Sequence, residues 1–212
     1  MNTTTKFPVT LAKRLELGPE IVRFSASWEE YLDLLEEADY NIEFENHEIL
    51  AMSIASDPHE AIVKNILVCL SNALDEDPTF HIRGSNRHVF IKEFGVDYAP
   101  DAHVTKGKPQ FYTLRKGLTA NLNPWLVVEV LSPSTNTQDW RKKLPRYKKI
   151  PSLQHIIYVE QDWPHISLFN RMDNSAAWEN TDYDQLGQSF TLSGKKIALT
   201  EVYKKIDFPE KK

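Results

Sequence analysis

A single glutamate inside an apolar segment limits what this chain can fold into. The run Trp125–Leu131 consists of β-forming residues between Pro124 and Ser132-Pro133, which predicts a buried strand. Glu129 lies within that run. A lone carboxylate in such surroundings costs on the order of several kcal/mol unless it is paired, protonated or bound to a metal. Glu129 therefore needs a partner from elsewhere in the chain.

Asp101 is the first candidate partner, because it follows Pro100 within a second strand-like segment, 96–105. Its separation from Glu129 suits two adjacent antiparallel strands joined by a long loop. The two carboxylates would then repel each other, and a divalent cation such as Mg²⁺ would remove that repulsion by binding both. The alternative is that Arg or Lys forms an ion pair with each carboxylate.

The segment 141–149 is the most basic part of the chain, with six Lys or Arg residues in nine positions. A solvated helix face is one interpretation. The other is that one lysine, Lys142 or Lys143, reaches back to Glu129 and stabilises charge on a reacting phosphate. The remaining cations would then contact nucleic-acid phosphates, and the candidates are Arg141, Arg146 and Lys148.

Three further polar residues lie near the start of a predicted helix over 57–74. Asp57 is expected as its N-cap, with Pro58 at N1 and Glu60 as a capping carboxylate at N3. His59 is either an exposed N2 residue or a helper that points into a cleft. Glu48 is a candidate third metal ligand, although exposure at the surface fits its position equally well.

Composition limits the function classes. The 212 residues carry a net charge of −5, so any nucleic-acid contact must come from a local basic face. The single cysteine, Cys69, permits no internal disulfide, which is typical of a reducing compartment. Neither a signal peptide nor an apolar stretch long enough to cross a membrane is expected. We therefore expect a cytoplasmic protein.

The order of the predicted elements favours an α/β (α+β) fold with a mixed central sheet flanked by helices. Ser27-Trp28-Glu29-Glu30 is a capping box that starts a helix. A hairpin over 41–53 and the helix over 57–74 follow, and 106–123 is expected to be a loop. We expect three parts: an N-terminal arm over 1–26, a single domain over 27–206 and a tail over 207–212. Two further helices are predicted, one after 134 and one near 200–203. The strands over 177–181 and 189–192 are expected to pair with each other. The remaining strands are predicted at 80–83, 88–91, 96–105, 125–131, 154–160 and 165–171.

The residues around Glu129 resemble a known family. Pro100-Asp101, the string Val127-Val128-Glu129-Val130-Leu131-Ser132-Pro133-Ser134-Thr135, and Asp139, Lys143 and Tyr147 after it are similar to the Uma-two family. This is a restriction-endonuclease-like family of the PD-(D/E)XK nuclease superfamily. The resemblance covers roughly residues 27–206, and it implies a restriction-endonuclease-like mixed sheet.

The resemblance also implies an active site. Asp101 and Glu129 would hold Mg²⁺ or Mn²⁺, and the catalytic lysine would come from the next helix. The superfamily places that lysine two residues after the acid, where this chain has Leu131. Lys143 is the matching residue in the helix, and Lys142 is its rival.

These observations lead to a Mg²⁺-dependent DNA endonuclease as the first functional hypothesis. A homodimer would fit, because cutting both strands often requires two sites. The rival hypotheses are a non-catalytic module that binds nucleic acid or protein on a nuclease-like scaffold, and an interaction protein without affinity for DNA.

Overall fold

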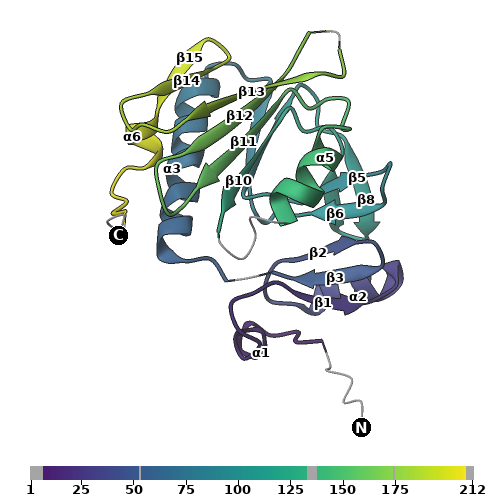
Figure 1. Ribbon diagram of the computed structural model, residues 1–212. Coiled ribbons are helices and arrows are strands. Elements are labelled where there is room, and N and C mark those ends of the chain that lie inside the picture. The colour runs from purple at the N-terminus through teal and green to yellow at the C-terminus, as the bar shows by residue number, and fades with distance from the viewer. Residues whose placement is uncertain (1–6, 53, 133–137, 174, 209–212) are drawn as a thin grey trace.

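The computed structural model describes residues 7–52, 54–132, 138–173 and 175–208. They form two sheets and a small ribbon, with helices packed against them (Figure 1). The main sheet has six strands in the order β13-β12-β11-β10-β7-β4. Its strands are β4 (Phe80–Gly84), β7 (Ala102–Lys106), β10 (Leu126–Leu131), β11 (His155–Glu160), β12 (Ile166–Arg171) and β13 (Trp178–Tyr183).

The main sheet is mixed because β10 and β11 run parallel, while every other neighbouring pair in it is antiparallel. A parallel pair needs a crossover connection. Here the crossover contains one turn of π-helix, η1 (Asp139–Lys143), followed directly by α5 (Leu144–Tyr147). Pro145 explains the wider turn, because it lacks an N–H and its ring clashes with the carbonyl four residues earlier in a regular α-helix. The mixed sheet flanked by helices agrees with the predicted fold class.

Helix α3 (Asp57–Leu74) covers one face of the main sheet (Figure 1). Its apolar residues recur at helical spacing and pack against β10 and β11. The helix begins one residue earlier than expected, because Ser56 is the N-cap and accepts a hydrogen bond from the backbone N–H of His59. His59 is therefore at N3 rather than N2. The C-terminal helix α6 (Leu199–Val202) and the ribbon of β14 (Ser189–Leu192) and β15 (Lys195–Ala198) pack on the same core.

The second sheet has seven strands in the order β1-β3-β2-β6-β5-β9-β8. The predicted hairpin is present as β2 (Ile42–Glu45) and β3 (Glu48–Ala51). Its turn residues Asn46 and His47 have φ values of +52° and +60°, which a tight two-residue hairpin turn requires. Helix α2 (Trp28–Glu37) starts at the predicted capping box and packs on this sheet. The remaining strands are β1 (Val22–Ser25), β5 (Val89–Ile91), β6 (Val96–Tyr98), β8 (Phe111–Arg115) and β9 (Leu118–Asn121).

Three expectations about chain organisation are corrected. The segment 106–123 contains the hairpin β8–β9, which turns at Gly117 with φ +89°, rather than an irregular loop. Strand β13 pairs with β12, and β14 pairs with β15, so the segments 177–181 and 189–192 do not pair with each other. The N-terminal segment is no separate arm from residue 7 onward, since α1 (Leu11–Leu15) precedes β1, which pairs with β3.

Arg14 shows why the N-terminal segment belongs to the domain. Its side chain is fully buried and donates to the backbone carbonyls of Ala51, Met52, Gly18 and Glu20. A buried guanidinium costs little only when its donors are satisfied in this way. The outermost predicted tail and arm residues, 209–212 and 1–6, lie outside the described residues, as do Pro133, Ser134 and Thr135 of the family-like string.

Candidate active site

The site lies where β7 and β10 run side by side. The two strands are antiparallel with Val128 opposite Ala102, as their spacing in the sequence predicts. Asp101 immediately precedes β7, and its Oδ2 accepts a hydrogen bond of 2.6 Å from the backbone N–H of Val130. Asp101 and Glu129 both line a cavity of about 330 Å³. The structure thus brings the two predicted carboxylates to one cavity.

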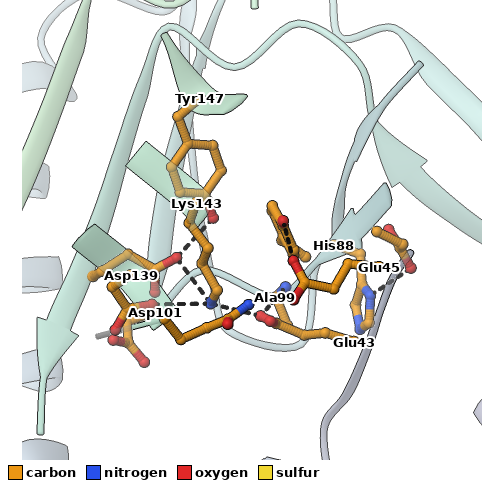
Figure 2. A network of polar contacts seen from close by, with 12 residues as sticks. Glu43, Glu45, His88, Ala99, Asp101, Asp139, Lys143 and Tyr147 are labelled. Atoms are coloured by element: carbon orange, nitrogen blue, oxygen red, sulfur yellow. Dashed lines mark hydrogen bonds and ion pairs between the residues drawn. The ribbon is translucent and has the colours of Figure 1, made fainter. Parts of the chain in front are cut away.

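Lys143 lies between several carboxylates at the base of this cavity (Figure 2). Its Nζ is 2.8 Å from Oε1 of Glu43, 3.3 Å from Oε1 of Glu129 and 3.4 Å from Oδ1 of Asp139. The side chain is only 2% exposed. Of the two rival lysines, Lys143 is therefore the one that reaches Glu129.

Glu43 is the residue that sequence reasoning missed. It lies on β2, is fully buried, and accepts hydrogen bonds from Lys143 and from the backbone N–H of Ala99. Alternation along 42–45 indicates that Ile42 and Phe44 face a core, and by default Glu43 would face solvent. The basic segment that forms η1 and α5 instead packs over the face of β2 that carries Glu43. One sequence signal could have revealed this contact: two acids on the same face of β2 have the opposite charge to the basic segment 141–149.

Tyr147 and Asp139 complete the surroundings of Lys143 and Glu129. The Tyr147 hydroxyl donates to Oε1 of Glu129 at 2.7 Å. Residues 139, 143 and 147 are spaced by four, so η1 and α5 present them on the same side, facing β10. Burial, together with the charges of Glu129 and Glu43, raises the pKa of Tyr147 well above its usual value. The hydroxyl therefore remains a donor over the physiological pH range.

The charges within the site are not balanced. Burial raises the pKa of Glu129 strongly; Lys143 opposes this rise, while Asp139, Asp101 and Glu43 add to it. Burial alone would lower the pKa of Lys143, but Glu129, Glu43 and Asp139 outweigh it and raise the pKa well above the usual value. One ammonium thus faces three nearby carboxylates. The cluster is short of positive charge.

His59 contacts the other predicted carboxylate. Its Nε2 is 3.1 Å from Oδ1 of Asp101, and both residues line the cavity. Burial lowers the pKa of His59, but the hydrogen bond to Asp101 and its negative charge raise it, and the net shift is upward. The predicted helper therefore lies next to the acid that it would assist.

Glu48 is the predicted metal ligand that the structure does not bring to this cavity. It lies on β3 opposite Glu45, and its Oε2 is 2.9 Å from Nη1 of Arg23. Its side chain is 36% exposed. Glu43, rather than Glu48, is the acid that the hairpin contributes to the site, because the β2 register places it beside Lys143, whereas Glu48 lies near the hairpin turn.

Most of the predicted phosphate-binding cations already have partners. Lys142 lies 3.0 Å from the buried Glu45 rather than next to Glu129, and Arg146 contacts Glu45 and Tyr98. The Nζ of Lys148 lies 4.5 Å from the centre of the Phe169 ring. Arg141 is exposed. Lys142 and Arg146 hold η1 and α5 against the second sheet through Glu45, which positions Lys143.

The donor set fits Mg²⁺ or Mn²⁺. Among the described residues, no three His, Cys, Asp or Glu side chains are arranged to hold a metal by themselves. Mg²⁺ commonly takes only one or two carboxylates, with waters and substrate phosphates completing its shell. Oε2 of the buried Glu43 has no hydrogen-bond partner among those residues, which again shows an excess of negative charge. Asp101 and Glu129 would be the metal ligands.

The fold is similar to that of a solved structure. A solved structure entitled "Crystal structure of a putative nuclease belonging to DUF820 from Anabaena variabilis ATCC 29413" superposes with a TM-score of 0.62, covering 81% of this chain and 96% of that one. The two sequences are 14% identical, so this likeness concerns the fold alone.

The family follows from the sequence match. The family model of Uma2, described as "Putative restriction endonuclease", matches residues 28–197, and the chain belongs to this family. Two proteins of Synechocystis sp. (strain ATCC 27184 / PCC 6803 / Kazusa) are also similar, and both are described as uncharacterized. One, sll1609, is 31% identical over 132 residues, which is 62% of this chain and 73% of the relative. The other, slr1290, is 29% identical over 171 residues, which is 77% of this chain and 87% of the relative.

Proposed function

We propose that this protein is a DNA endonuclease that hydrolyses phosphodiester bonds with the help of Mg²⁺ or Mn²⁺. The observation that carries the proposal is the meeting of Asp101, Glu129 and Lys143 at one cavity from two adjacent strands and the following crossover. Membership of a family described as restriction endonucleases supports it. No helix among the described residues combines the length and the apolar character that a membrane span needs.

The metal ion would be held by Asp101 and Glu129. When bound, such an ion polarises a phosphate and lowers the pKa of the attacking water. Asp101 is well suited to its part, because the Val130 N–H and His59 fix both of its oxygens. Tyr147 fixes one oxygen of Glu129 in the same way.

Lys143 supplies the positive charge of the chain itself. Its ammonium lies beside Glu129 and lines the cavity in which a phosphate would bind. Negative charge builds up on the phosphate oxygens in the transition state, and a fixed cation in a buried site stabilises it strongly. Glu43 and Asp139 hold the ammonium in place, so Lys143 need not reorganise during the reaction.

The contacts of Lys143 also support a second candidate function. The amine is saturated by carboxylates and almost fully buried, as in a structural ion-pair cluster. A non-catalytic module that binds nucleic acid or protein on a nuclease-like scaffold would have such a cluster. The two candidates differ in whether the cluster takes up a divalent ion and cuts DNA.

A plasmid-nicking assay tests the proposal. Purified protein is mixed with supercoiled plasmid and Mg²⁺, alongside Asp101→Asn and Glu129→Gln. Nicking by the unaltered protein, with loss in both variants and in EDTA, supports the proposed function. Equal nicking by all three proteins would indicate that a contaminating nuclease cuts the plasmid, and this result would overturn the proposed function. Cleavage of both strands would further support a homodimer. Light scattering measures the oligomeric state of the protein directly.

A further inference from the structure

A second cavity adjoins the one at the candidate site. It has a volume of about 560 Å³ and lies next to the second sheet. Asn41, Glu60 and Ser85 line both cavities, so the two are adjacent. A nucleic-acid strand with one phosphate at Asp101 and Glu129 would have its neighbouring nucleotide close to the second cavity.

The second cavity brings together cations that the predicted basic segment 141–149 does not provide. Arg87 and His88, from the connection between β4 and β5, both line it. Nη2 of Arg87 is 3.1 Å from Oγ1 of Thr119, another residue of the lining. This contact is neutral, and the guanidinium also lies 5.7 Å from the centre of the Phe111 ring. The second cavity thus offers two basic side chains that lie outside the basic segment.

The orientation of His88 favours a ligand contact. Its Nδ1 lies 2.8 Å from Oδ2 of the buried Asp97, and the Tyr31 hydroxyl donates to the same oxygen. An imidazole bound to a carboxylate through Nδ1 has its Nε2 on the opposite side of the ring. The side chain is 11% exposed, at the wall of the cavity.

The pKa of His103 is lowered by burial and by the same cations. Burial first, and then the positive charges of Arg83, Arg87 and His88, lower its pKa to about 4. Arg83 lies opposite His103 in the β4–β7 pair, and Arg87 and His88 follow in the connection after β4. The lining also contains the acids Asp39 and Glu60, so the cavity is mixed rather than uniformly basic. Such a lining suits a nucleotide, which offers hydrogen-bond donors on its base as well as a phosphate.

We propose that the second cavity binds the nucleotide next to the scissile phosphate, with the phosphate of that nucleotide on Arg87 and His88. This inference rests on the proposed function and names its substrate-binding path. Phosphates then follow the two adjacent cavities, while Arg146 and Lys142 remain engaged with Glu45.

Fluorescence anisotropy with a fluorescein-labelled DNA oligonucleotide tests the inference, using the full chain with Ca²⁺ in place of Mg²⁺. Arg87→Ala should weaken binding about fivefold or more, since it removes one charged hydrogen bond. The slope of log affinity against log salt, measured between about 50 and 200 mM, should fall by about one. Arg87→Lys should restore much of that slope. Lys195→Ala is the control, because Lys195 pairs with Glu76 on the surface and lines neither cavity, and it should bind like the unaltered protein. Arg141→Ala tests the alternative path along the exposed basic segment.

The outcomes separate this inference from the proposed function. If Arg87→Ala binds and nicks DNA like the unaltered protein, the nucleotide path is wrong while the nuclease proposal stands. If Arg141→Ala weakens binding and Arg87→Ala does not, the phosphates follow the basic segment instead. If the unaltered protein shows no binding to DNA even at low salt, both proposals fail. Circular dichroism of each variant shows whether a loss reflects misfolding. Arg87→Gln, which also removes the charge, serves as the test if Arg87→Ala is unfolded.

Discussion

Nζ of Lys143 lies 2.8 Å from Oε1 of Glu43 and joins the crossover after β10 to strand β2 of the other sheet. The two residues are 100 positions apart in the sequence. This contact makes the candidate site a product of both sheets, because Glu129 comes from the main sheet and Glu43 from the second. We infer that Glu43 positions Lys143.

Replacing Glu43 by glutamine tests that role. Glu43→Gln keeps the shape of the side chain but removes the charge that holds the ammonium. Losing a hydrogen bond to a charged group is worth about 1.5–3 kcal/mol, so the single-turnover cleavage rate should fall roughly 10- to 100-fold. Glu48→Gln is the control, since Glu48 contacts Arg23 outside the cavity. Equal rates for both variants would show that Glu43 does not position Lys143.

The two neighbouring lysines should differ sharply. Lys143→Met leaves Glu43, Glu129 and Asp139 without their cation, and breaking such a buried cluster costs about 3–5 kcal/mol. Lys142 is 40% exposed, so Lys142→Met should cost no more than about 1 kcal/mol. Urea unfolding measures both values. Divalent metal should raise the melting temperature of Lys143→Met more than that of the unaltered protein, because it replaces the missing charge. A smaller rise would argue that no cation binds beside Glu129.

Tyr147→Phe removes the hydroxyl that donates to Glu129 and leaves the ring in the core. The variant should be less stable by about 1.5–3 kcal/mol, the range for a hydrogen bond to a charged group. Thermal unfolding at neutral pH measures this loss. Because a protonated Glu129 needs the bond less, the loss should shrink at acid pH. A loss that does not change with pH would mean that Glu129 is already protonated at neutral pH.

Glu45 should make stability depend on pH. Burial alone would raise its pKa, but the neighbouring side chains of Gln138, Lys142, Arg23 and Tyr98 lower it from 4.5 to about 2. A lowered pKa stabilises the fold above pH 4.5, and the stabilisation disappears as the pH falls from 4.5 through 2. The shift corresponds to about 3 kcal/mol.

The matching experiment compares urea unfolding of Glu45→Gln and the unaltered protein across that pH range. The variant should be less stable at pH 7, and the difference between the two proteins should narrow steadily as the pH falls toward 2. Parallel curves, with a constant difference, would show that the charge of Glu45 is not stabilised by its surroundings.

Local signals predicted much of the fold. The capping box at Ser27 starts α2, and the predicted hairpin turns at Asn46-His47. The apolar run containing Glu129 forms a strand beside the strand that follows Asp101. These features depend on neighbours in the sequence or on a single pair of strands, so pattern and spacing are sufficient to find them.

The missed features depend on contacts between distant segments. Glu43 and Glu45 alternate with apolar residues like the exposed face of a hairpin, yet both are fully buried because the helix with Lys142, Lys143 and Arg146 covers them. The segment before residue 26 lacks a clear strand pattern, and β1 is held by pairing with β3 and by the carbonyls around Arg14. Tertiary structure, rather than propensity, determines these regions.

Calorimetric titration of Mn²⁺ into the unaltered protein, Asp101→Asn, Glu129→Gln and Glu48→Gln tests the central claim most directly. We expect one divalent ion per chain, an affinity at least about tenfold weaker in Asp101→Asn and in Glu129→Gln, and no change in Glu48→Gln. An unchanged affinity in both site variants, or no binding by the unaltered protein, would contradict the assignment of Asp101 and Glu129 as a shared metal site.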